Sequence, residues 1–242
     1  LAIAACQQPV QPEMAPGKVQ VEPVITRATE VNFEAGDQIG FTMTKVNGTE
    51  AYADNAALTF DGTVFSGDLK WYADAYSEAD VYAYYPYNAN GTPTAYFVVE
   101  DQTDGIAKAD LMAAVKKGVL PTPNAITMVF KHLMTKLVIN IDNQSGAEVT
   151  GVEIGGCRLV TGLDISEMAL TKYTDIVIEA EPLIKAYEAT AGKVWQAIVI
   201  PDKAKLEIIV NLSNGKKITQ PLAEMTLKSG GQYSINARLL QD

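Results

Sequence analysis

Two positions near the start of the chain carry residue types that processing enzymes act on, and the first is Cys6. It follows residues 1–5, a run of small and branched apolar side chains. A lipoprotein signal peptidase accepts such a run because only small side chains fit beside the scissile bond, and the cysteine then takes the lipid. We therefore predict that Cys6 is the lipid-attachment residue and that the sequence begins inside a signal peptide.

The second position is the Arg27-Ala28 bond. Residues 7–17 mix Gln and Pro with almost nothing that could build a core, and residues 19–25 form a short extended-looking segment in front of the arginine. An arginine after such a segment is a place where a protease could release the body of the protein. We predict that residues 1–27 are a signal-peptide remnant, lipobox and cleavable leader, with protease cleavage between Arg27 and Ala28.

Catalytic and metal-binding residues are hard to find. His132 is the single histidine, and without a second histidine or clustered thiols a zinc site would lack ligands. A serine hydrolase needs a base and a Gly-x-Ser-x-Gly elbow, and the sequence has no such elbow. We predict that His132 is structural and that the protein is not an enzyme, with no catalytic residue, no metal and no cofactor.

Two groups of carboxylates have a functional and a structural interpretation. The first group, Asp74, Glu78 and Asp80, flanks aromatic residues, as the carboxylates of a glycosidase site would. We favour the structural interpretation, in which these charges lie on the solvent face of strands. Residues 101–105 resemble half of a calcium loop without its terminal glutamate, and we predict a turn there.

Aromatic residues are concentrated between Trp71 and Tyr87. Exposed aromatic rings stack on sugars or anchor protein partners. In the alternative that we favour, alternate rings fill the core and the others cover it. The first interpretation supports an alternative function, a stand-alone outer-membrane lipoprotein that binds glycan or host protein through the aromatics of Trp71 to Tyr87.

Composition excludes some classes of partner. The net charge is −10, and residues 28–125 hold five Lys or Arg against fourteen Asp or Glu, so a nucleic-acid partner is disfavoured. No apolar run of 18 residues follows the leader, so no membrane-spanning helix is expected. Cys157 lies among apolar residues, and we predict a buried thiol and no disulfide.

Alternation of apolar and polar residues predicts an all-β protein. Turn signals mark hairpins at Asn47-Gly48, Asp61-Gly62 and Asn214-Gly215. The expected strands cover residues 79–87, 96–99, 129–141, 175–179, 194–200, 206–212 and 230–239. Residues 105–117 contain good helix formers without one clear apolar face, so helix and strand both stay open.

Two prolines, Pro121 and Pro123, indicate a domain boundary because each removes a backbone donor and favours extended geometry. We predict an N-terminal domain over residues 28–123 and a C-terminal domain over residues 124–242. Short strands with regularly spaced turns predict an antiparallel β-sandwich in each.

Several motifs, taken in order along the chain, are similar to those of one family. They are the lipobox ending at Cys6, the Arg27-Ala28 junction, Gly36-Asp37-Gln38-Ile39-Gly40, Tyr82-Ala83-Tyr84-Tyr85-Pro86-Tyr87, Lys108-Ala109-Asp110-Leu111-Met112, Phe130-Lys131-His132 with the strand after it, and the closing strand with Gly230-Gly231-Gln232-Tyr233. Their order and spacing resemble the fimbrillin-like proteins of Bacteroidales over nearly the whole chain.

The resemblance implies two tandem transthyretin-like β-sandwich domains and export as a lipoprotein to the outer membrane. It also implies that an arginine-specific protease cuts in the leader, which places the lipid on Cys6 and the cut after Arg27. In the family, removal of the first strand leaves a hydrophobic groove that an extended segment of another subunit fills.

The physical basis of such strand exchange is general. A sandwich that lacks one strand exposes unpaired backbone groups and an apolar slot, and an incoming donor strand satisfies both. We predict that residues 19–25, alone or together with the strand after Arg27, fill this slot before cleavage. The predicted function is a structural pilin subunit of a cell-surface fimbrium, as stalk, tip or anchor, that supports adhesion. Its expected partners are other pilin subunits, the protease, the outer membrane, and a host protein or glycan.

Overall fold

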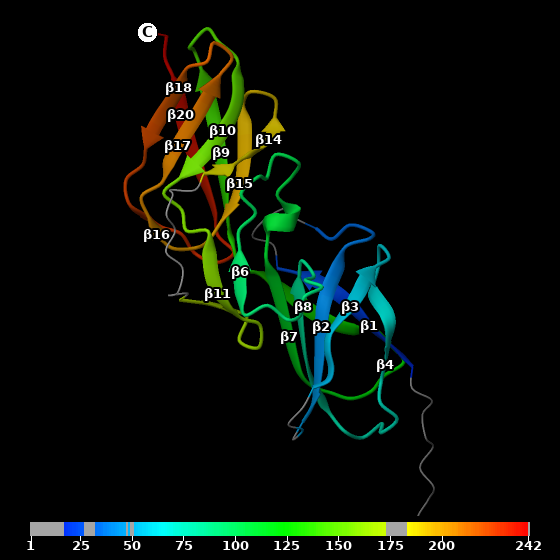
Figure 1. Ribbon diagram of the computed structural model, residues 1–242. Helices are drawn as coiled ribbons and strands as arrows, with labels where there is room; N and C mark the ends of the chain where they lie inside the picture. The colour runs from blue at the N-terminus through cyan, green and yellow to red at the C-terminus, as the bar shows by residue number, and fades with distance from the viewer. Residues whose placement is uncertain (1–16, 27–31, 47, 49–50, 173–182, 242) are drawn as a thin grey trace, which may run out of the picture.

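The computed structural model describes residues 17–26, 32–46, 48, 51–172 and 183–241. These residues form β-strands and one short 3-10 helix, η1 (Ala107–Ala109), so the prediction of an all-β protein is confirmed. Figure 1 shows an elongated molecule with an N-terminal lobe and a C-terminal lobe. Within the described residues, no helix has the length and apolar character needed to cross a membrane.

The N-terminal lobe is a closed barrel with the strand order β1-β4-β3-β2-β5-β7-β8. Its strands are β1 (Lys18–Ile25), β2 (Gln38–Lys45), β3 (Ala51–Phe60), β4 (Phe65–Lys70), β5 (Ala79–Tyr85), β7 (Met112–Val119) and β8 (Ile126–His132). Alternate side chains of these strands point inward, and Phe41, Phe65 and Phe130 are fully buried there. The core of this lobe therefore lies inside the barrel.

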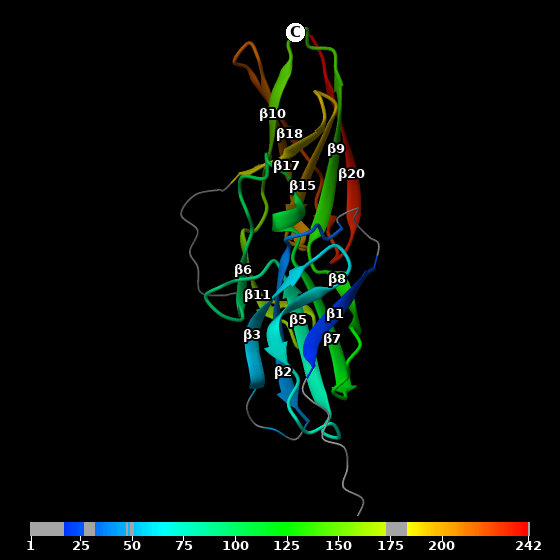
Figure 2. The ribbon, with the colours of Figure 1, turned by 90° about the vertical axis from the view of Figure 1, so that its right-hand side faces the viewer.

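The C-terminal lobe consists of two four-stranded sheets, β13-β10-β17-β18 and β14-β15-β9-β20. Its strands are β9 (Thr135–Asn143), β10 (Val149–Gly155), β13 (Ile184–Lys185), β14 (Tyr187–Thr190), β15 (Val194–Val199), β17 (Glu207–Leu212), β18 (Lys217–Pro221) and β20 (Gln232–Leu239). Figure 2 shows β9, β10 and β20 running along the length of the molecule. The lobe is a sandwich, because apolar side chains of both sheets meet in one core.

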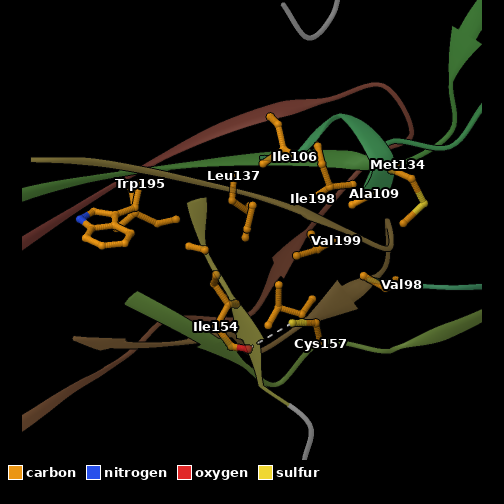
Figure 3. Close-up of a cluster of buried hydrophobic side chains, with 14 of the residues drawn as sticks. Val98, Ile106, Ala109, Met134, Leu137, Ile154, Cys157, Trp195, Ile198 and Val199 are labelled. Carbon is orange, nitrogen blue, oxygen red and sulfur yellow. Dashed lines mark hydrogen bonds between the residues drawn. The ribbon is translucent and has the colours of Figure 1, made fainter. Parts of the chain in front are cut away.

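Figure 3 shows part of this second core, where Leu137, Trp195 and Ile154 lie among other buried apolar side chains. Cys157 is at its edge, with its Sγ 3.7 Å from the carbonyl oxygen of Ile154. It is a free thiol and buried, as predicted. Burial raises the pKa of the Cys157 thiol to about 12.

We expect Cys157 to resist alkylation in the folded protein. A thiol with that pKa holds roughly a thousandfold less thiolate at neutral pH than an exposed cysteine, and its burial also blocks the reagent. Intact mass after iodoacetamide treatment of a chain that starts at Gln7 should show no adduct, and one adduct after denaturation in guanidinium. Rapid labelling without denaturant would contradict the buried position of this thiol.

A small sheet joins the two halves of the chain. It contains β6 (Ala95–Phe97), β11 (Val160–Asp164) and β12 (Ala169–Thr171), in the order β12-β11-β6. A two-stranded pair, β16 (Lys203–Ala204) and β19 (Met225–Thr226), lies in the C-terminal half. In Figure 1, β6 and β11 lie between the lobes. The N-terminal half is thereby hydrogen-bonded to a hairpin of the C-terminal half.

Two of the hairpins predicted from turn residues are confirmed. The turn at Asp61-Gly62 joins β3 to β4, and the Asp61 carboxylate accepts the backbone N–H groups of Thr63 and Val64 at 2.8 and 2.9 Å. Asn214-Gly215 joins β17 to β18, with Gly215 at a φ of 80°. Strands β2 and β3 pair antiparallel on either side of the predicted Asn47-Gly48 turn, of which Asn47 lies outside the described residues.

Three sequence predictions need correction. Residues 129–141 are not one strand, because the chain leaves the barrel at Leu133 and Met134 and enters the sandwich as β9. Not all pairings are antiparallel, since β1 with β8 and β20 with β9 are parallel. The N-terminal half is a closed barrel rather than an open sandwich.

Over residues 105–117, where the sequence leaves helix and strand open, the structure has η1 followed by β7. Three other predictions stay predictions. The predicted strand at residues 175–179 lies outside the described residues. The predicted division after residue 123 precedes β8, which completes the N-terminal barrel. The description of the halves as transthyretin-like domains also stays a prediction.

Candidate functional site

The first strand, β1, forms the closing seam of the barrel. It pairs antiparallel with β4, with Val21 opposite Phe65, and parallel with β8, with Val21 opposite Ile126. Its sequence, KVQVEPVI, alternates apolar and polar residues at its start, which is the pattern of a strand with one buried face. Strand β1 therefore holds together the two strands that would otherwise be the edges of the sheet.

Two side chains anchor β1 in the barrel core. Val19 and Val21 are fully buried. Burial of two valine side chains stabilises the barrel by about 3 to 6 kcal/mol, before the hydrogen bonds to β4 and β8 are counted. Loss of β1 would expose this apolar slot together with the edges of both neighbouring strands.

Each half of β1 pairs with a different neighbouring strand. Pairing with β4 covers the part from Lys18 to Val21, and from there to Ile25 the strand pairs only with β8. Pro23 has no N–H to donate, and Val24 is 45% exposed. The end of β1 nearest the predicted cleavage junction therefore has an open edge.

Described residues on both sides of the predicted junction are anchored. The backbone N–H and the hydroxyl of Thr26 both donate to the carbonyl oxygen of Phe130, at 3.1 and 3.2 Å. The Phe33 ring packs at 4.9 to 5.3 Å, centroid to centroid, against the rings of Phe65, Phe130 and Tyr85. The predicted site residues Cys6, Arg27 and Ala28 lie outside the described residues.

This arrangement explains what a cut after Arg27 would separate. On one side remains Phe33, which belongs to the aromatic cluster of the barrel. On the other side is β1, held by hydrogen bonds and two valines. The sequence patterns did not reveal that β8 is the partner of β1, and nothing in β8 alone indicates it, because that pairing joins residues about a hundred positions apart.

The aromatic residues between Trp71 and Tyr87 are mostly structural. Trp71, Tyr72, Tyr84 and Tyr85 are buried, as the favoured interpretation predicted. Burial raises the pKa of the Tyr84 and Tyr85 hydroxyls above the usual range. Tyr76 is 62% exposed, and Tyr82 and Tyr87 are half-buried.

The other candidates also have structural roles. His132 is buried, with its Nδ1 2.8 Å from a carboxylate oxygen of Asp110. Asp74 accepts hydrogen bonds from Tyr76 and Ser77 in a local turn. Among the described residues, no group of three or more His, Cys, Asp or Glu side chains could hold a metal ion.

The predicted turn at residues 101–105 is confirmed. The Asp101 carboxylate accepts the hydroxyl of Thr103 at 2.6 Å and pairs with the Lys185 ammonium at 2.9 Å. Both contacts lower the pKa of Asp101 to about 2. Its oxygens are engaged in a turn and an ion pair, which is the arrangement of a structural aspartate.

The described residues form an all-β protein. Its aromatic side chains are mostly buried, and β1 completes its barrel. A sequence model of one family, described as fimbrillin-like, matches residues 26–242. The chain belongs to the fimbrillin-like family. The resemblance found in the sequence motifs is thereby confirmed.

Individual relatives agree with this assignment. A protein of Bacteroides uniformis named as a candidate fimbrium subunit, Fim1C, is 27% identical over 216 residues, which cover 82% of this chain and 67% of the relative. Two crystal structures of proteins described as candidate cell adhesion proteins share the fold. One is from Bacteroides uniformis, with a TM-score of 0.70 and 23% identity, and covers 93% of both chains. The other is from Bacteroides ovatus, with a TM-score of 0.72, 20% identity and the same coverage of 93%.

Proposed function

We propose that the chain is a structural subunit of a cell-surface fimbrium that assembles by protease-triggered strand exchange and supports adhesion. In this proposal it is exported as a lipoprotein through Cys6, and an arginine-specific protease cuts after Arg27. Release of β1 then opens the barrel for a strand of another subunit. The observation that carries the proposal is the position of β1 between β4 and β8.

The physical argument rests on what β1 leaves behind. Without it, β4 and β8 become unpaired edges beside an apolar slot once filled by Val19 and Val21. An extended segment of a second chain would satisfy the backbone groups and fill the slot at the same time. A barrel closed by its first strand is therefore suited to serve as an acceptor.

The shape of the molecule suits a fibre. In Figures 1 and 2 the C-terminal end of the described chain and the start of β1 lie at opposite ends of the elongated molecule. A contact between unlike surfaces at opposite ends is heterologous and can repeat without closing. Subunits joined in this way would form a filament.

Family membership supports the same proposal. The match to the fimbrillin-like family begins at residue 26, where β1 has just ended. The family is one of fimbrial structural proteins rather than enzymes, and relatives carry names of fimbrial and cell adhesion proteins. We infer a location at the cell surface, with the outer-membrane lipid anchor and the transthyretin-like character of both halves as parts of the proposal.

A chain that starts at Ala28 tests the role of β1. We expect it to form a ladder of multimers that survives detergent without boiling, whereas a chain that starts at Gln7 stays monomeric. A synthetic peptide of residues 18–26, added in excess, should suppress the ladder because it refills the slot.

The matched control is the same peptide with Val19→Asp and Val21→Asp, which should not suppress the ladder because buried carboxylates without partners are costly. Gel electrophoresis and size-exclusion chromatography measure both results. If the chain starting at Ala28 stays monomeric and melts at the same temperature as the longer chain, β1 is not a removable strand and the proposal is wrong.

A further inference from the structure

A pocket with a volume of about 470 Å³ lies on the outside of the barrel, where it faces the small sheet. One wall comes from β2, β3 and β5, and the other from β11, β12, the turn between them and residues 92–94. Its size falls within the range of about 300 to 1,000 Å³ that is usual for small-molecule sites. Twelve residues line it, among them Thr42, Asp54, Tyr82, Tyr84, Asp164 and Ser166.

The floor of the pocket is held in place by Tyr84. Its hydroxyl donates to the amide oxygen of Asn55 at 2.6 Å and accepts the backbone N–H of Asn88 at 3.1 Å. Its ring lies over Gly40, where a Cβ atom would clash with the ring. The glycine therefore leaves room for a tyrosine on the outer face of the barrel.

The wall at β3 contains a strained residue. Asn55 has a φ of 50°, in the left-handed region, at an irregularity in the pairing of β2 with β3. Its backbone N–H donates to the hydroxyl of Thr42 at 3.1 Å. Bulges of this kind redirect side chains and are frequent beside functional sites. Here the irregularity places the preceding residue, Asp54, in the wall.

Two carboxylates face the pocket from opposite walls. Asp54 accepts the hydroxyls of Thr42 and Thr92 at 3.3 and 3.1 Å. Asp164 accepts the hydroxyl of Ser166 at 2.7 Å, which helps to lower the pKa of Asp164. In each case these bonds go to Oδ1, and within the described part of the chain Oδ2 accepts no hydrogen bond. Each carboxylate thus offers an acceptor to a ligand.

The lining indicates the class of ligand. No Lys, Arg or His side chain is among the lining residues, so an anionic ligand would face two carboxylates without a counter-charge. A sugar ring carries hydroxyl donors at its edge and C–H groups on its face, which match carboxylate oxygens and the face of an aromatic ring. Tyr82, half-buried, supplies such a ring.

We propose that this pocket binds a neutral pyranose sugar. The hydroxyls of the sugar donate to Asp54 and Asp164, and its apolar face packs on Tyr82. Aliphatic side chains of Leu163 and Ile165 complete the lining and disfavour a small ammonium ion, which would lose its hydration there. The proposed site goes beyond strand exchange and does not depend on it, because no residue of β1 lines the pocket.

Binding is tested on the chain that starts at Gln7, which keeps β1. Methyl glycosides of glucose, galactose, mannose and fucose are titrated separately, and chemical shifts or heats are recorded. We expect saturable binding of at least one, weakened about tenfold or more by Tyr82→Ala or by Asp54→Asn. Tyr76→Ala is the matched control, since Tyr76 is an exposed aromatic that does not line the pocket, and should bind as the unchanged chain does.

A second variant guards against a general loss of folding. Thr92→Trp places a large side chain at the pocket from an exposed loop position, and should abolish binding while the melting temperature is kept. The proposal is overturned if no glycoside saturates, if Tyr82→Ala and Thr92→Trp bind as well as the unchanged chain, or if only a methylammonium probe binds. None of these results changes the outcome of the multimer assay. The sugar-binding proposal and the strand-exchange proposal can therefore fail independently of each other.

Discussion

A chain with Arg27→Ala is expected to stay monomeric after digestion with an arginine-specific protease, whereas the unchanged chain loses the residues before Ala28 and forms multimers that survive detergent. Before cleavage, β1 is tethered to its slot, and its effective concentration there is of the order of millimolar or higher. After cleavage the tether is gone, so a strand from another subunit competes with β1 on equal terms. Intact mass and an unboiled gel measure the two results.

Arg158→Ala provides the matched control for this digestion. The described arginines, Arg158 and Arg238, form ion pairs with Asp202 and Asp142 at 2.6 and 3.2 Å, and Arg238 lies within β20. We expect the folded chain to be cut little at either, so Arg158→Ala should be processed and assembled like the unchanged chain. If the protein with Arg27→Ala assembles after digestion, or if cleavage at Arg27 yields only monomers, release of β1 is not the trigger.

Local patterns in the sequence predict where the strands and turns of this fold lie better than they predict which strands pair with each other. The alternation at the start of β1 and the turns at Asp61-Gly62 and Asn214-Gly215 depend on neighbouring residues, so they can be recognised in the sequence. The parallel pairing of β1 with β8 depends on closure of the barrel, which no local pattern encodes. The same limit applies to the apolar run through Leu133 and Met134, which has the pattern of one strand although it crosses from one core to the other.

The aromatic stretch shows why the pocket was not predicted. Tyr84 and Tyr85 are neighbours and both are buried, one in the core of the C-terminal lobe and one inside the barrel. A strand between two cores has no single solvent face, so alternation cannot distinguish Tyr82 as the ring that lines a pocket. Asp54 and Asp164 are more than a hundred residues apart, and only the folded chain brings them to the same cavity.

An engineered disulfide between β1 and β8 should block assembly until it is reduced. Val24 and Val129 are paired across the two strands and are 45% and 44% exposed, so both side chains lie on the outer surface. Neighbouring strands are about 4.8 Å apart, which is within the range of about 4.4 to 6.8 Å between Cα atoms joined by a disulfide. We expect the double variant Val24→Cys with Val129→Cys to form that disulfide on oxidation.

In its oxidised form, the locked protein should be cut after Arg27 and still remain monomeric, because β1 stays attached to β8 by a covalent bond. Addition of a reductant should then release β1 and start assembly in the same sample. The single variant Val24→Cys is the control and should assemble with or without reductant; Cys157 is buried and not available for exchange. Assembly of the oxidised protein, with the disulfide verified by mass, would mean that the acceptor slot is elsewhere than between β4 and β8. Assembly only after reduction would show that departure of β1 from this seam, and not cleavage alone, controls polymerisation.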